Sequence, residues 1–335
     1  MSTLKNNKLL ILLAFLSIYV IWGTTFLAIH YGLKGFPPFI LSGFRFLIAG
    51  VILLLWLYFV KGEKPFSAYA WKRNTVSGFL ILTIGVGAVT WAEQYISSTE
   101  AAIIIASEPF WFILVDKRNR SFYLNNKLAI TGLLIGFAGL LLFFKDSLAV
   151  SAATDSLATI RTISFVLLVV TALVWVMGSL YSKKTTGESL FMNVAQQLII
   201  GGATSLLIAT INGEWNQLNI EAVPSDAWAG LLYLIVFGSI IAYMSFIWLL
   251  SVKPAALVST HTFVNPLVAV AAGVFISGET ITTGQAAGVV IILVGVIITN
   301  VVQYEVPKRT KVKIRRTTRI FIRFYQSGKQ QITQI

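Results

Sequence analysis

The chain has 335 residues, of which 56% are hydrophobic and 12% are charged, and its formal net charge is +13. Soluble domains carry about 25% charged residues, and a soluble protein of this length could not bury so much apolar surface. The composition therefore excludes an ordinary soluble protein and predicts an integral membrane protein. The absence of cysteine also excludes disulfides and thiol chemistry.

In chain order, apolar runs separated by polar breaks predict ten membrane-spanning helices. A helix needs about 20 mostly apolar residues to cross the hydrocarbon core of a bilayer, and clusters of charge, Gly or Pro mark where the runs end. The first run continues past Trp22 to His30 without a small-residue cleavage site, so we interpret it as an uncleaved span and not as a signal peptide. The ten spans are predicted at residues 8–30, 37–60, 74–96, 98–115, 126–144, 160–182, 189–211, 227–250, 255–277 and 282–303.

The two halves of the chain repeat one pattern. The stretch from Gly132 to Gly139 is echoed by Gly288 to Gly295, an offset of 156 residues. Similar offsets of 153, 152 and 157 residues relate three further pairs, Trp22 and Trp175, Gly78 and Gly230, and Pro109 and Pro266. A nearly constant offset at many positions indicates a duplicated unit, which we place at residues 8–144 and 160–303.

Five spans in each unit have a geometric consequence. Because five is an odd number, the second unit must enter the membrane from the side opposite to the first. The predicted fold is therefore an all-α integral membrane protein with ten transmembrane helices arranged as two inverted five-helix repeats. Inverted repeats place a substrate site near the middle of the bilayer at their interface, where alternating access can operate.

Positive charge predicts the orientation in the membrane. With the N-terminus inside, 22 of the 26 Lys and Arg residues fall in cytoplasmic segments. The outer loops hold only Lys34, Lys145 and Arg161, while Arg45 lies inside a span. Positive charge gathers on the cytoplasmic side of membrane proteins. We therefore expect a multi-pass protein of the cell (inner or plasma) membrane with both termini in the cytoplasm.

The last segment, residues 306–335, carries nine basic residues and no acidic one. Basic residues next to a membrane are attracted to anionic lipid headgroups by about 1 kcal/mol each. We interpret this segment as a cytoplasmic tail that contacts membrane lipids. A nucleic-acid partner is a much weaker alternative, and none is expected.

Arg45 and Glu108 are the two charged residues predicted to lie deepest in the membrane. An ionised side chain near the centre of a span costs about 2.5–3.5 kcal/mol on insertion scales, so such residues are usually functional. In the second half, Gln197 and Asn265 stand at the matching positions. Two interpretations remain open: an ion pair between Arg45 and Glu108 that only orients helices, or a site in which Glu108 exchanges protons or binds substrate while Arg45 tunes it or binds an anionic group.

A second set of residues could contribute to the same path. Trp22 and Trp175 are repeat mates at similar depth. Pro109 and Pro266 would loosen two equivalent helices and so act as gating kinks, although packing explains intramembrane prolines equally well. His261 precedes Asn265 by one helical turn and is either a proton acceptor or a satisfied core histidine. The remaining candidates, for which interfacial or packing roles compete, are Trp91, Tyr243, Thr24, Thr25, Glu93 and Gln94.

The glycines inside the spans predict close helix contacts more than they predict sites. Gly132 and Gly136 have the spacing of small residues that lets two membrane helices approach closely. The same spacing is a weak signal for a homodimer, so both a packing role and a dimer interface remain open.

Several of these residues together resemble a known family. Trp22-Gly-Thr-Thr-Phe-Leu-Ala28, Arg45-Phe46, Ser107-Glu-Pro109 and Val264-Asn-Pro266 with Gly278-Glu279 are similar to the EamA family of the drug/metabolite transporter superfamily. The resemblance covers residues 8–303 and implies an inverted-repeat inner-membrane carrier that exports amino acids, metabolites or drugs. One departure is that the first half has Asp116-Lys-Arg-Asn-Arg120 where a counterpart of Gly278-Glu279 would stand.

An enzyme is not expected. The two histidines, His30 and His261, lie in distant parts of the chain, and the sequence contains no zinc-protease, nucleophile-elbow or phosphate-loop motif. No catalytic residues, metal ligands or cofactors are therefore assigned. We expect a secondary active transporter that exports small organic solutes, with protons or another coupling ion. The alternative is a channel or a lipid scramblase or flippase of the same fold.

Overall fold

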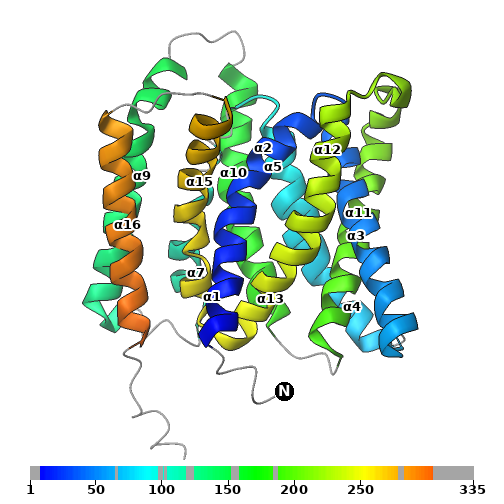
Figure 1. Ribbon diagram of the computed structural model, residues 1–335, viewed down its shortest axis with the longest axis horizontal. Coiled ribbons are helices and arrows are strands. Elements are labelled where there is room, and N and C mark those ends of the chain that lie inside the picture. Colours follow the sequence, from blue (N-terminus) through cyan, green and yellow to red (C-terminus); the bar gives the residue numbers. More distant parts are fainter. Residues whose placement is uncertain are drawn as a thin grey trace, which may run out of the picture.

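The protein is a bundle of helices whose axes are roughly aligned with one another (Figure 1). The computed structural model describes residues 8–64, 67–96, 101, 104–117, 124–151, 158–183, 188–277 and 283–304, and within them it contains helices and no strand. The basic segment 306–335 and the loop residues Arg118–Arg120 and Gly278–Glu279 lie outside the described residues.

Three long helical segments form most of the first half. The first joins α1 (Lys8–Leu16), the π-helical η2 (Ser17–Ile21) and α2 (Trp22–Gly32). The second is α3 (Pro38–Lys61), and the third joins α4 (Ala68–Gly78), the π-helical η3 (Phe79–Gly87) and α5 (Ala88–Ala92). The shorter α7 (Glu108–Val115) and the long α9 (Lys127–Ser151) follow.

The second half presents a similar series. It contains α10 (Ala158–Ser182), α11 (Leu190–Ile211), two short 3-10 turns η4 (Glu214–Asn216) and η5 (Ile220–Ala222), and a segment of α12 (Ser225–Tyr233), the π-helical η6 (Leu234–Ala242) and α13 (Tyr243–Val252). The chain then forms α14 (Ala255–Val258), α15 (His261–Ser277) and α16 (Thr283–Tyr304).

Six of the described helical segments are long and apolar enough to cross a membrane. They are Lys8–Gly32, Pro38–Lys61, Ala68–Ala92, Thr159–Ser182, Leu190–Ile211 and Ser225–Val252. Five of them agree with a predicted span within two residues at each end, whereas Ala68–Ala92 begins six residues before the predicted span 74–96 and ends four residues before its end. Many large apolar side chains on these segments are exposed, including Leu12, Phe59, Val166 and Leu232, as expected where lipid covers the surface.

Helix ends follow local sequence signals. α3 begins with Pro38. Proline fits the first turn of a helix because the N–H that it lacks would have no partner within the helix there. α3 ends at Gly62, whose φ of 66° is a left-handed conformation that glycine adopts readily. α11 begins after Ser189, whose hydroxyl accepts a hydrogen bond from the N–H of Met192 at 3.1 Å.

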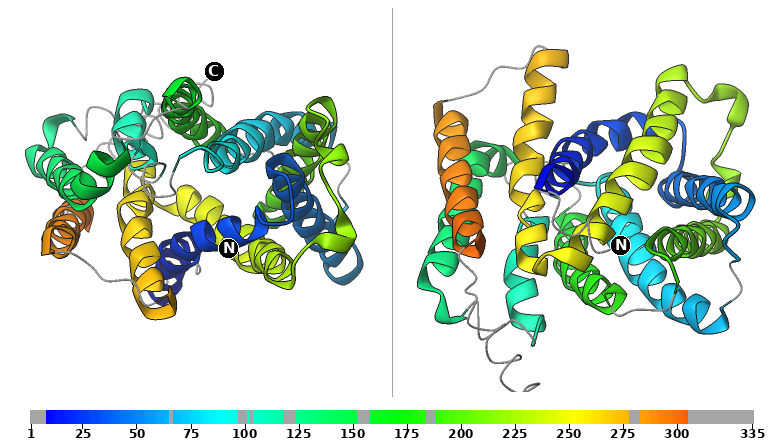
Figure 2. Two further views of the ribbon diagram at one scale, coloured as in Figure 1. Left: turned by 90° about the horizontal axis from the view of Figure 1, so that it is seen from above. Right: turned by 60° about the horizontal axis from the view of Figure 1, so that its bottom comes forward.

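Two pairs of helices pack backbone to backbone through glycine. α3 and α11 lie side by side, and so do α9 and α16 at the other end of the molecule (Figures 1 and 2). On α3, a Cβ atom at Gly50 would lie 2.7 Å from the backbone nitrogen of Ile199 on α11, and one at Gly202 on α11 would overlap the backbone nitrogen of Leu47 on α3. The two contacts are related by one sequence offset, because Gly50 and Gly202 are 152 residues apart, and so are Leu47 and Ile199.

The second helix pair repeats this arrangement. A Cβ atom at Gly139 of α9 would lie 2.7 Å from the backbone nitrogen of Ile292, and one at Gly295 of α16 would overlap the backbone nitrogen of Gly136. Here Gly139 and Gly295 are 156 residues apart, and so are Gly136 and Ile292. Small residues at such crossings allow the close approach on which helix packing in membranes depends.

Candidate functional site: a cavity between the two halves

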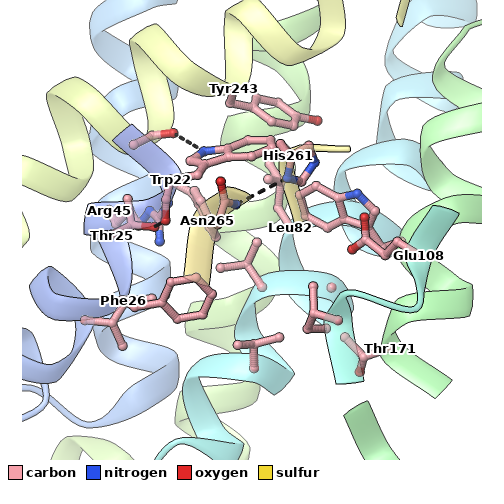
Figure 3. A pocket seen from close by; sticks show the side chains of 18 residues that line it. Trp22, Thr25, Phe26, Arg45, Leu82, Glu108, Thr171, Tyr243, His261 and Asn265 are labelled. Carbon is pink, nitrogen blue, oxygen red and sulfur yellow. Dashed lines mark hydrogen bonds between the residues drawn. The ribbon is translucent and has the colours of Figure 1, made fainter. Parts of the chain in front are cut away.

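A cavity opens near the middle of the bundle. Residues from both halves line it, and the side chains reach into it from α2, α3, η3, α10, α13 and α15 among others (Figure 3). Its wall is mostly aromatic and aliphatic, with a few polar groups, which is the usual composition of a site for an organic molecule. The predicted site residues that line it are Trp22, Thr25, Arg45, Glu108, Trp175, Tyr243, His261 and Asn265.

Arg45 is held on one side of the cavity by the π-helical segment η6. Its side chain is buried, and Nε donates a hydrogen bond to the Ser239 hydroxyl at 2.9 Å. That hydroxyl in turn donates to the backbone carbonyl of Leu234, five residues earlier, at 2.9 Å. Gly238 leaves room for the guanidinium, because a Cβ atom there would lie 3.0 Å from Nη2. The guanidinium also lies 4.8 Å from the centre of the Phe46 ring.

Glu108 lies on the opposite side of the cavity from Arg45 (Figure 3). It is the first residue of α7 and is only 3% exposed, and its Oε2 atom is buried without a hydrogen-bond partner. Among the described residues, no ion pair joins Arg45 to Glu108, and the ion pair nearest to them in sequence joins two exposed residues, Lys34 and Asp226. The structural ion pair between Arg45 and Glu108 is therefore absent. A buried carboxyl group without a partner is costly, which favours a functional role.

Three aromatic rings pack together beside the cavity, and two of them, Trp22 and Trp175, line it. Trp22 and Trp175 meet edge to face with ring centres 5.8 Å apart, and Phe246 packs against both at 5.1 and 5.6 Å. The Trp22 indole donates a hydrogen bond from Nε1 to the carbonyl of Gly238 at 3.2 Å. The Trp175 Nε1 atom and the hydroxyl of Thr171 are buried without partners.

His261 stands edge-on against the Trp22 ring at 4.8 Å, and its Nδ1 atom lies 3.3 Å from the side-chain amide of Asn265. The amide orientation that satisfies its surroundings has Oδ1 facing Nδ1 and the amide nitrogen facing the carbonyls of Ile18, Tyr19 and His261. In that arrangement Nδ1 carries the proton and Nε2 is an acceptor, and Nε2 is buried without a partner. One of the two ring nitrogens of His261 therefore has no hydrogen-bond partner in the protein.

The other predicted site residues lie outside the cavity lining. Gln197 is one hydrogen bond away, because its Oε1 accepts from the Tyr243 hydroxyl at 2.6 Å. The Thr24 hydroxyl bonds that of Tyr233 at 2.6 Å. Trp91 packs on Tyr95 at 4.9 Å, and neither it nor its neighbours Glu93 and Gln94 contribute to the cavity wall. These residues occupy the end of α5 and the turn after it, beyond the reach of the cavity.

The two prolines occupy different structural positions. Pro109 follows a turn at Ala106–Ser107 and stands in the first turn of α7, where it begins a helix without kinking one. Pro266 lies inside α15. Glu108 owes its place in the cavity wall to this break before α7, because the break brings the start of a helix, and not its side, to the cavity.

Sequence analysis missed Ser239 and Thr171. Ser239 follows a glycine in the middle of a span, and Thr171 precedes Trp175 by one helical turn and so shares its face. Both signals are common in membrane helices, where serine and threonine usually bond their own backbone. The contact of Ser239 with Arg45 joins residues 194 positions apart, and no local pattern could indicate it.

The chain is similar in sequence to several known proteins. The chain is 28% identical over 299 residues to a protein named "Uncharacterized inner membrane transporter YedA" of Escherichia coli K12, covering 88% of this chain and 92% of that one. It is 27% identical over 310 residues to "Uncharacterized transporter YvbV" of Bacillus subtilis, covering 90% and 94%. A chloroplastic WAT1-related protein of Arabidopsis thaliana is 24% identical over 290 residues, covering 85% and 68%.

The fold also matches one already solved. A crystal structure with 16% sequence identity superimposes with a TM-score of 0.69 and covers 88% of this chain and 97% of its own. The model of the EamA-like transporter family matches twice, at residues 9–145 and 162–301. With two matches that together span most of the helical bundle, the chain belongs to the EamA-like transporter family.

Proposed function

We propose that this protein is a secondary active transporter of small organic solutes that works by alternating access between two inverted repeats. The cavity between the halves is the observation that carries the proposal, since it contains an arginine and a carboxyl group on opposite sides and several polar atoms without protein partners. The reciprocal glycine contacts and the two matches to one family model support the repeats.

The cavity chemistry favours a substrate with two polar ends. An anionic group would find the Arg45 guanidinium, which is held by Ser239 and has further N–H donors. A cationic or donor group would find the Glu108 carboxyl and the Nε2 acceptor of His261. The aromatic and aliphatic wall between them suits an apolar body. Amino acids, related metabolites and amphiphilic drugs all satisfy this description.

Direction and coupling are part of the same proposal. Export rests on the family resemblance, and coupling to protons rests on the depth and isolation of Glu108. We further propose that both termini face the cytoplasm of the cell membrane, which the distribution of Lys and Arg supports. Contacts of the tail with anionic lipid would accompany that orientation.

The test is counterflow in proteoliposomes loaded with unlabelled solute, using a panel of labelled amino acids and amphiphilic drugs. Wild type should show saturable counterflow, and Arg45→Gln and Glu108→Gln should each reduce it at least tenfold at low substrate. Lys34→Gln, which removes an exposed cation outside the cavity, provides the matched control and should retain the wild-type rate.

The other outcomes have distinct meanings. Flux that does not saturate and shows no counterflow would support a channel or scramblase. Saturable counterflow that survives both cavity substitutions would leave a carrier but remove Arg45 and Glu108 from its site. Proton coupling is rejected if an imposed pH gradient still drives transport in Glu108→Gln at saturating substrate.

A further inference from the structure

A chain of buried hydrogen bonds begins at the cavity wall and leads away from it. The Tyr243 hydroxyl donates to Oε1 of Gln197 at 2.6 Å, and Nε2 of Gln197 donates to Oδ1 of Asn74 at 2.9 Å and to the Ser182 hydroxyl at 3.0 Å. These four residues come from α13, α11, α4 and α10. One amide side chain therefore ties together helices from both halves of the protein.

The Asn74 amide extends the network, in which Nε2 of Gln196 is the one amide nitrogen of Asn74, Gln196 and Gln197 left buried without a partner. Nδ2 of Asn74 donates to Oδ1 of Asn193 at 2.8 Å and to Oε1 of Gln196 at 2.7 Å. Asn74, Gln196 and Gln197 are at most 2% exposed. Amide groups in such a place are costly unless their hydrogen bonds are made, so separation of α4 from α11 becomes favourable only when water or another partner replaces these bonds.

The network and the cavity occupy different depths in the bundle. α1 begins at the end of the molecule where the N-terminus lies (Figure 1), and α2 continues toward the opposite end. The cavity residues Trp22, Phe26 and Ile29 follow one another along α2 in that direction. Asn74, in contrast, lies two turns from the start of α4, and Ser182 is the last residue of α10, both near the N-terminal end. The network thus closes the bundle between the cavity and that end.

Close backbone packing reinforces the closure on this side. A Cβ atom at Gly78 would lie 2.6 Å from the backbone oxygen of Gln197, so α4 lies directly against α11 at the network. For Gly230, the counterpart of Gly78 in the second half, the nearest atom is the backbone oxygen of Ala28 on α2, whereas the atoms nearest to Gly78 belong to α11. The two halves therefore differ in conformation. Alternating access exchanges such conformations between repeats, which requires α4 to leave α11.

We propose that Asn74, Gln197 and Tyr243 form the gate that closes the cavity toward the cytoplasm. Tyr243 belongs to both structures, since its ring lines the cavity and its hydroxyl holds Gln197. A substrate that enters the cavity and displaces this hydroxyl releases one of the bonds that hold the gate shut. The inference rests on the proposed transport function and names the residues that change between its two states.

The experiment measures access to the cavity and needs no knowledge of the substrate. Because the chain contains no cysteine, Val86→Cys in the cavity wall is a single reactive site. Purified protein is reconstituted in vesicles of defined orientation, and a membrane-impermeant maleimide is added to one face at a time. With an intact gate, Cys labelling should occur from the face opposite the N-terminus. Asn74→Ala and Gln197→Ala should raise labelling from the N-terminal face at least fivefold.

Two further variants keep the result interpretable. Tyr243→Phe removes only the hydroxyl and should raise labelling from the N-terminal face as well, even if the amide variants prove unstable. Thr83→Val removes the hydrogen bonds of η3 with the Gly201 carbonyl at 3.2 Å and the Thr204 hydroxyl at 2.5 Å, both on α11 and outside the network. It should leave the sidedness unchanged. Equal labelling of all folded variants from the N-terminal face would overturn the gate.

The outcome separates the gate from the transport function. Sided labelling that changes with Asn74 and Gln197, in a protein without counterflow, would leave the gate standing and reject the carrier. If counterflow is observed but the Asn74 and Gln197 variants do not change the side from which the cysteine is labelled, the carrier is supported and the gate is rejected.

Discussion

Glu63 and Glu214 make equivalent contacts at opposite ends of the helix pair formed by α3 and α11. Glu63 follows the C-terminus of α3 and accepts a hydrogen bond from the Ser189 hydroxyl at 2.5 Å, and Ser189 is the N-cap of α11. Glu214 follows the C-terminus of α11 and accepts bonds from the N–H groups of Phe39 and Ile40, both at 3.0 Å, in the first turn of α3. Each helix is therefore followed by a carboxylate that secures the start of the other.

This relationship predicts how stability depends on pH. Burial raises the pKa of the Glu214 carboxyl, and the two backbone hydrogen bonds from Ile40 and Phe39 only partly offset the effect. The folded protein then holds this proton more tightly than the unfolded chain, so the contribution of Glu214 is largest below its unfolded pKa of about 4.3. It is lost as the pH rises through the raised folded value.

Glu214→Gln should remove that dependence, because an amide oxygen accepts the same two bonds and does not ionise. The difference in unfolding temperature between variant and wild type, measured in detergent, should become more favourable to the variant from pH 4.5 to pH 8. Glu221→Gln, which changes an exposed carboxylate in the same loop, is the control and should show a smaller trend. A difference that is constant over this range would contradict the expectation. Glu214→Ala should cost about 1–2 kcal/mol at pH 4.5, since two N–H groups at a helix start lose their partner. The cost should fall as the pH rises to 8, because the wild type loses the contribution of Glu214 over that range.

The glycine contacts predict a sharp difference between neighbouring positions on α11. Gly202→Leu would force α11 away from the backbone of Leu47 on α3, and overpacking of this kind costs about 1–3 kcal/mol or more. Ala203 is exposed, so Ala203→Leu should leave the unfolding temperature within a few degrees of wild type. Thermal unfolding in detergent checks both variants. A similar loss in both would show that the α3–α11 crossing is less tight than its backbone contacts indicate.

Six spans could be predicted from the sequence because they depend on local composition. Apolar runs mark where a helix can cross a membrane, and the offset between Gly50 and Gly202 is visible without coordinates. The cavity was predicted less well. Arg45 and Glu108 were recognised by their depth, but their separation depends on the helix break before Pro109 and on Ser239, which is distant in the chain. Trp91, Glu93 and Gln94 have suitable side chains, yet the end of α5 carries them away from the cavity.

Ser239 should act on transport through Arg45. Ser239→Ala removes the hydrogen bond that fixes the guanidinium, so the arginine should sample more orientations and the substrate concentration at half-maximal counterflow should rise about 3- to 10-fold. Maximal flux should change much less. Ser239→Thr retains a hydroxyl and should recover most of the affinity. If Ser239→Ala lowers maximal flux and leaves half-saturation unchanged, the residue does not position Arg45 for binding.

Trp22 and Trp175 offer a comparison within one molecule, because the same substitution removes different interactions. The Trp22 indole N–H bonds the carbonyl of Gly238, whereas that of Trp175 has no protein partner in its buried position. Trp22→Phe should therefore lower the unfolding temperature more than Trp175→Phe, by a difference that corresponds to about 1 kcal/mol for one buried hydrogen bond. Trp175→Phe should in turn raise the substrate concentration at half-maximal counterflow while changing the unfolding temperature little, since its N–H is free to bind substrate. Thermal unfolding and counterflow on the same preparations measure both effects. A larger stability loss in Trp175→Phe would show that its indole N–H is satisfied within the protein and does not serve the substrate.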